Sequence, residues 1–164
     1  KVRSIRIHGS GETKYDNIRI GINGRLDSIQ AAVLLEKLII FENEMHLRDR
    51  VAMRYTNGIS DSYIKPYIPL NYNSSWAQYS ILIPNSIHRK EIIKKLKEKD
   101  IPVMIYYKIP LHLQKVFLSL GYKMGDFPIS EIISKKIISL PMYPYLDKKS
   151  QDKIIEHLNK ILEN

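Results

Sequence analysis

A glycine-flanked asparagine and arginine form the first group of residues that could do chemistry. The run Gly21-Ile22-Asn23-Gly24-Arg25 stands immediately before a long helical pattern. Glycine permits close approach of a ligand to the backbone, and the Arg25 guanidinium offers a planar fork for phosphate or carboxylate. The first N–H groups of a helix also lack internal partners and attract anions. The run predicts an anion-binding corner, with a surface turn and an ordinary helix cap as the alternative.

The second group is rich in tyrosine and follows a predicted strand. It reads Tyr106-Tyr107-Lys108-Ile109-Pro110-Leu111-His112-Leu113-Gln114. Tyrosine rings stack on a base or sugar while their hydroxyls form hydrogen bonds, and loops after strands often carry ligand contacts. The run therefore predicts a ligand-contacting loop. The alternative is a packed aromatic corner, and for His112 alone we favour a packed, capping role.

Several other chemistries find no support. Gly9-Ser10-Gly11 does not match the phosphate-loop pattern, and the five histidines lack metal-ligand spacing, so we predict no metal site. No serine-hydrolase elbow occurs, and Asp126 and Glu131 are too weakly placed to indicate a catalytic carboxylate pair. The absence of cysteine excludes disulfides and thiolate sites and fits a cytoplasmic location.

Composition limits the size of the core and the classes of partner that the chain can have. With 164 residues, 44% of them hydrophobic, the chain can bury a core of one domain or slightly more. Its formal charge of +9 would suit a nucleic-acid binder, but nucleic-acid motifs are absent, and lysines that solvate helix faces explain the charge as well. No apolar run approaches the length of a membrane span, and no signal peptide is evident. We expect neither nucleic acid nor membrane as a partner.

One long helix must position the anion-binding corner. The pattern runs from Asp27 to about Ile59, with Asp27 as N-cap, Gln30 completing a capping box, and Asn57-Gly58 at the end. At about 1.5 Å per residue such a helix spans roughly 45 Å. That length exceeds the width of a small domain, so we expect the helix to connect two bodies.

The rest of the chain predicts a small α/β lobe. Alternation and apolar runs indicate strands at 76–84 and 101–106, and helical periodicity covers 88–99, 113–120, 129–138 and 148–162. Gly121 should stop the second of these helices. Strands interleaved with helices indicate a mixed α/β class.

Together these stretches resemble the DegT/DnrJ/EryC1/StrS family of sugar aminotransferases, which depend on pyridoxal phosphate (PLP). The matching runs, in family order over nearly the whole chain, are Arg6-x-His8-Gly9, Gly21-x-Asn23-x-Arg25-Leu26-Asp27-x-x-Gln30-Ala31-Ala32-Val33-Leu34, Tyr106-Tyr107 with Pro110-Leu111-His112-Leu113-Gln114, Gly125-Asp126-Phe127-Pro128-x-Ser130-Glu131, and Ser139-Leu140-Pro141-Met142-Tyr143-Pro144.

The resemblance implies the C-terminal part of a fold-type I PLP-dependent transferase. Residues 1–26 would be a remnant of the large PLP-binding domain, 27–59 the connecting helix, and 60–164 the small C-terminal α/β domain. The family's Schiff-base lysine should precede Arg6-x-His8-Gly9, and no lysine here has that context. The start at Lys1 rather than Met also suggests a missing upstream half. We therefore assign no catalytic residue within this chain.

Site roles follow from the resemblance residue by residue. Asn23 matches the asparagine that reaches across a homodimer interface to the partner's PLP phosphate, and Arg25 matches a nearby arginine that contacts substrate. Tyr106 and Tyr107 fall where the family contacts the nucleotide-sugar, and His112, which matches the pattern, is assigned with them to substrate binding. Lys108 stands where the family usually has proline, a departure that bears on loop geometry and substrate identity.

The implied function is amino transfer, with glutamate as the expected donor, to a nucleotide-linked keto sugar, for which a UDP-linked uronic acid is our nearest expectation. The missing N-terminal half and a homodimer partner are the expected protein partners. The alternative is an inactive remnant or interaction module of the same fold. In that case the apolar helix face from Ile29 to Phe41 would be left uncovered.

Overall fold

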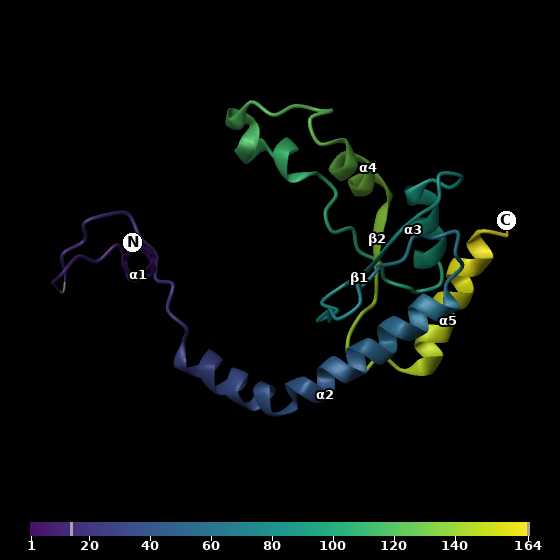
Figure 1. Ribbon diagram of the computed structural model, residues 1–164, viewed down its shortest axis with the longest axis horizontal. Helices are drawn as coiled ribbons and strands as arrows, with labels where there is room; N and C mark the ends of the chain where they lie inside the picture. The colour runs from purple at the N-terminus through teal and green to yellow at the C-terminus, as the bar shows by residue number, and fades with distance from the viewer. Residues whose placement is uncertain (14, 164) are drawn as a thin grey trace. The chain divides into compact units, whose positions relative to one another are not determined.

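The structure is a computed structural model that describes residues 1–13 and 15–163. They form two compact units, Lys1–Glu42 and Asn43–Asn164. The boundary falls inside helix α2, Ser28–Gly58, which contributes to both (Figure 1). Among the described residues, no helix combines the length and apolar character needed to cross a membrane.

The first unit begins with the short helix α1, Val2–Arg6, followed by a loop that doubles back on itself. Isolated bridges pair Ile7 with Asn23 and Ser10 with Asn17. Gly21 lies so close to the returning chain that an added Cβ would be 2.1 Å from the Gly9 nitrogen. The molecule's own backbone thus fills the space beside Gly21, which corrects our expectation that this glycine makes room for a ligand.

The long helix begins and ends as its sequence predicts. The Ile29 N–H donates to Asp27 Oδ1 at 2.8 Å, and the Asp27 N–H donates to Gln30 Oε1 at 3.4 Å, which confirms the capping box. The helix ends at Gly58. There the Asn159 amide donates to the Gly58 carbonyl and accepts from the Ser60 N–H, both at 2.9 Å.

A two-stranded antiparallel sheet lies at the centre of the second unit. Strand β1, Tyr79–Leu82, pairs with β2, Ile137–Leu140, so that Tyr79 faces Leu140 and Leu82 faces Ile137. Bridges from Ile64 to Leu82 and from Met104 to Ser139 extend the sheet by one pairing on each side.

Two sequence predictions about this sheet are wrong. Of the described residues 101–106, only Met104 pairs with a strand, so no second strand forms there. Helix α4, Pro128–Lys136, stops two residues before its predicted end at residue 138, and β2 follows directly. The β-branched pair Ile137-Ile138 suits a strand, and the three residues from Ile138 to Leu140 are all buried, so both faces of β2 are covered. The Arg89 guanidinium donates to the carbonyls of Ser134 and Ile137 at this junction.

The remaining helices match the prediction more closely. Helix α3 spans Arg89–Lys97 and α5 spans Lys148–Ile161. The stretch expected as one short helix consists instead of two 3₁₀ segments, η1 at Leu111–Leu113 and η2 at Lys115–Leu120. Gly121 ends η2 with φ of +83°, in the left-handed region that favours glycine.

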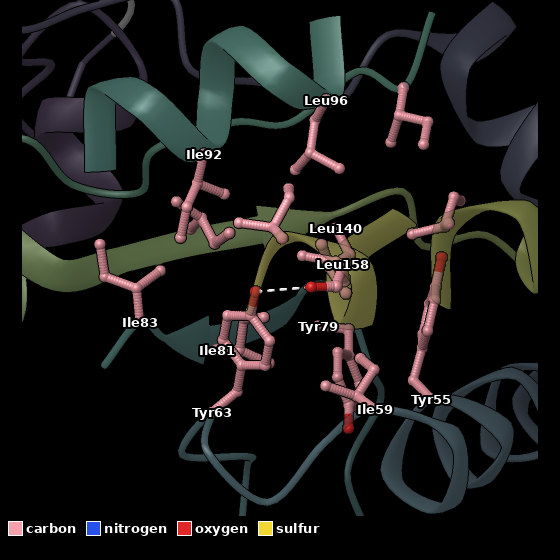
Figure 2. Close-up of a cluster of buried hydrophobic side chains, with 14 of the residues drawn as sticks. Tyr55, Ile59, Tyr63, Tyr79, Ile81, Ile83, Ile92, Leu96, Leu140 and Leu158 are labelled. Carbon is pink, nitrogen blue, oxygen red and sulfur yellow. Dashed lines mark hydrogen bonds between the residues drawn. The ribbon is translucent and has the colours of Figure 1, made fainter. Parts of the chain in front are cut away.

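The core lies between the sheet and the helices of the second unit. Figure 2 shows Ile92 and Leu96 of α3 on one side of the sheet, and Tyr55 and Ile59 on the other. The Tyr63 hydroxyl donates to the Leu158 carbonyl of α5 at 2.9 Å. A small antiparallel sheet flanked by helices confirms the mixed α/β class.

Candidate functional site

Asn23 and Arg25 lie side by side on the surface of the first unit. Arg25 Nε donates to Asn23 Oδ1 at 3.2 Å, and both side chains are exposed. In the described part of the chain, the Asn23 amide nitrogen and the two terminal nitrogens of Arg25 have no acceptor. These groups are all donors, two of them carried by a fixed cation, so the pair can bind an anion.

Asp27 caps the N-terminus of α2 in part. Its carboxylate accepts from the Ile29 N–H at 2.8 Å and places a negative charge at the helix end. A contribution of the other N–H groups of the first turn to the anion-binding corner stays a prediction.

A cavity of about 550 Å³ borders Arg25 in the same unit. Its other walls come from the doubled-back loop, among them His8, Glu12 and Tyr15. Asn23 does not line this cavity, so Arg25 is the member of the pair that faces it. The guanidinium can therefore contact a ligand held by the loop.

Tyr106 and Tyr107 line a separate cavity in the second unit. Its volume is about 440 Å³, and its walls come from the tyrosine-containing loop, η1 and α4. The two rings meet edge to face with centroids 6.1 Å apart, and Tyr107 is 74% exposed. Gln114 and Ser130 add polar groups to a largely apolar lining. Such a surface can hold a ring by stacking and orient it through a few hydrogen bonds.

His112 lies behind this cavity rather than in its lining. The side chain is 8% exposed, its Nε2 is 3.0 Å from Glu131 Oε1, and its ring packs on Phe127 with centroids 4.8 Å apart. The ring also borders a smaller, mostly apolar cavity of about 310 Å³. This environment matches the packed alternative for His112 and leaves substrate contact as a prediction.

Glu131 is the residue that sequence reasoning missed. The residue as a whole is 6% exposed, and its carboxylate accepts from the Gly125 N–H at 2.8 Å and the Phe127 N–H at 3.4 Å, besides its contact with His112. Burial raises the pKa of this carboxyl, but the bonds from Gly125, His112 and Phe127 outweigh it and hold the pKa below its ordinary value. Two signals in the sequence could have marked it: its place at the start of α4, where acidic groups suit the dipole, and its place at the end of the family-matching run from Gly125 to Glu131.

The structure therefore brings the predicted residues together as two groups. Asn23 and Arg25 form one group in the first unit, and Tyr106, Tyr107 and His112 lie in one region of the second. Among the described residues, no group of three or more His, Asp or Glu side chains is placed to hold a metal ion.

Comparison with known proteins gives the same family throughout. A model of the DegT/DnrJ/EryC1/StrS aminotransferase family matches residues 1–159. A UDP-2-acetamido-2-deoxy-3-oxo-D-glucuronate aminotransferase of Pseudomonas aeruginosa is 38% identical over 91% of this chain and 40% of its own. A dTDP-3-amino-3,4,6-trideoxy-alpha-D-glucose transaminase of Micromonospora megalomicea is 32% identical over 98% of this chain and 44% of its own.

Solved structures agree with these relatives. A DegT DnrJ EryC1 StrS aminotransferase from Brucella abortus superimposes with a TM-score of 0.84 at 49% identity, over 98% of this chain and 42% of that one. NtdA from Bacillus subtilis with bound cofactor PMP gives a TM-score of 0.81 at 25% identity, over 98% of this chain and 38% of that one. The chain thus spans about two fifths of the length of these proteins. On the family match and these relatives, the chain belongs to the DegT/DnrJ/EryC1/StrS aminotransferase family.

Proposed function

We propose that this chain forms the C-terminal part of a PLP-dependent aminotransferase that acts on a nucleotide-linked keto sugar, with glutamate as amino donor. The family match and the names of the relatives support the reaction class. The exposed donors of Asn23 and Arg25 are the observation that carries the proposal. The Pseudomonas aeruginosa relative favours a UDP-linked 3-keto uronic acid as the acceptor.

The donor set of the Asn23–Arg25 pair fits the phosphate of PLP. An amide N–H₂ and a guanidinium present only donors to an anion, and the hydrogen bond between the two side chains fixes their relative orientation. When bound, PLP supplies the electron sink for amino transfer. We assign Asn23 to the phosphate of the cofactor in a partner subunit and Arg25 to a neighbouring substrate contact.

The second unit would hold the sugar nucleotide. Tyr106 and Tyr107 provide rings for stacking and hydroxyls for hydrogen bonds, and their cavity of about 440 Å³ suits part of such a ligand. This chain's residues thus bind and orient, while the Schiff-base lysine lies in the PLP-binding half, which we propose as its partner. A homodimer then brings Asn23 to the second cofactor.

The proposal also assigns a role to each segment of the chain. Residues 1–26 belong to the PLP-binding domain, 27–59 form the connecting helix, and 60–164 form the small domain. The two compact units divide within α2, between Glu42 and Asn43. A connecting helix that contributes residues to both bodies is compatible with that division.

Reconstitution with the PLP-binding half of a family relative tests the proposal. We expect the mixture to show the visible absorbance of bound PLP and to transfer an amino group from glutamate to a UDP-linked 3-keto sugar. Loss of one charge-assisted contact is worth about 1.5–3 kcal/mol. Asn23→Ala and Arg25→Gln should therefore each weaken cofactor or substrate binding by roughly tenfold or more.

Arg3→Gln provides the matched control, because Arg3 is an exposed guanidinium in the same unit with no acceptor among the described residues. It should leave binding unchanged. A mixture that holds no PLP, or Asn23 and Arg25 variants that bind cofactor and substrate as tightly as the parent chain, would contradict the proposal.

A further inference from the structure

One carboxylate oxygen joins three parts of the second unit. Glu131 Oε1, carried by α4, is 3.0 Å from His112 Nε2 in η1 and accepts from the Gly125 and Phe127 N–H groups of the loop before α4. The side chains of both Glu131 and His112 are buried. The Ser134 hydroxyl also donates to the Glu131 carbonyl at 2.9 Å, which adds a contact within α4.

The neighbours of this pair in the sequence form a wall that two cavities share. Leu111 precedes His112, Ser130 precedes Glu131, and both line the Tyr106–Tyr107 cavity of about 440 Å³ as well as the aromatic cavity of about 310 Å³. The bond between His112 and Glu131 therefore holds the two sides of that wall together. Its loss would let η1 move away from α4.

We propose that Glu131 is a positioning residue for the sugar-nucleotide site, acting through His112 and the Gly125 and Phe127 amides to fix the wall formed by Leu111 and Ser130. The inference rests on the proposed function. It changes the expected role of His112 from contact with substrate to support of the residues that make contact.

Acceptor geometry, more than negative charge, accounts for the arrangement. Two of the three groups on Oε1 are neutral backbone amides, and an amide oxygen at the same place can accept from both. A methyl group in its place leaves these N–H groups without their partner, at a cost in free energy. Gln and Ala substitutions of Glu131 therefore separate positioning from charge.

Amide hydrogen exchange of this 164-residue chain is the first measurement. In Glu131→Ala the Gly125 and Phe127 amides should exchange at least about tenfold faster, while Glu131→Gln should stay within about threefold of the parent chain. Asp126→Ala is the matched control, because the Asp126 carboxylate of the same loop accepts from the Lys123 N–H. It should leave both amides unchanged. Unchanged exchange in Glu131→Ala, or equal acceleration in Glu131→Gln, would overturn the inference.

Steady-state kinetics of the reconstituted enzyme is the second measurement. Glu131→Ala should raise KM for the sugar nucleotide about tenfold with kcat within about threefold, and Glu131→Gln should restore KM. A fall in kcat at constant KM would contradict a positioning role. If the parent enzyme transfers no amino group, the proposed function fails, while the exchange data still decide whether Glu131 orders the wall.

Discussion

Replacing Asn159 with alanine should destabilise the second unit measurably. The Asn159 side chain donates to the Gly58 carbonyl and accepts from the Ser60 N–H, both at 2.9 Å, so one amide from α5 satisfies both groups where α2 ends. Each such bond contributes about 0.5–1.5 kcal/mol net, so losing both should cost about 1–3 kcal/mol. At roughly 4 °C per kcal/mol for a unit of this size, the melting temperature should fall by about 4–12 °C.

Thermal and urea unfolding followed by circular dichroism would measure this loss. Asn159→Asp keeps the acceptor for Ser60 but replaces the donor to Gly58 with a carboxylate oxygen, so it should be at least as destabilising as alanine. Asn57→Ala is the control, because Asn57 is exposed and lies in the last turn of the same helix. An Asn159→Ala variant within about 0.3 kcal/mol of the parent would refute the reasoning.

Three further predictions concern other contacts in this unit. Burial raises the pKa of Tyr63 to about 12, so the contribution of its protonated hydroxyl to the free energy of unfolding is complete below about pH 10 and is lost as the pH rises through 12. In unfolding experiments across this pH range, Tyr63→Phe should reduce the loss of stability at alkaline pH. Tyr67→Phe, at an exposed position, should not reduce it. Hydrogen bonds from the Ser150 hydroxyl and N–H hold the pKa of Asp147 below its ordinary value, so the contribution of this carboxylate to stability is present above about pH 4 and is lost at lower pH. Asp147→Ala should lower the melting temperature at pH 7, and the difference in melting temperature between variant and parent should shrink in acid. Gly121→Ala places a side chain at a backbone φ of +83°, which should destabilise the end of η2 by about 1–2 kcal/mol. Gly121→Asn should destabilise it less. Amide hydrogen exchange of η2 would measure both losses.

Local signals explain why the start of α2 and the end of η2 were predictable. Asp27 and Gln30 form a capping box from side chains three residues apart, and Gly121 stops η2 by its own conformational freedom. Neither depends on a distant partner. The strand β2 does depend on one, because Ile137 and Ile138 continue the apolar pattern of α4 and become a strand only through pairing with β1. The β-branched pair favours a strand only weakly, so the long-range pairing decides the structure of this segment.

The candidate site shows the same difference between contacts that are local in the sequence and contacts that are distant. The contact between Asn23 and Arg25 was predictable because residues two apart in an extended segment lie on the same face, and Asn23 belongs to such a segment through its bridge to Ile7. The packed environment of His112 agrees with the role favoured from the sequence, but its partner was not predictable, because Glu131 lies 19 residues away and belongs to a helix whose placement depends on the sheet. The Glu131 carboxylate, which accepts from two amides of the loop before α4, was considered in the sequence only as part of a catalytic pair.

The direct passage from α4 into β2 limits how this region can vary among relatives. Lys136 ends the helix, Ile137 begins the strand, and Arg89 ties both sides of the junction through the Ser134 and Ile137 carbonyls. An inserted residue would shift every later strand position to the opposite face of the sheet. Length changes in homologous chains should therefore collect in exposed stretches such as 67–73 and be absent at this junction.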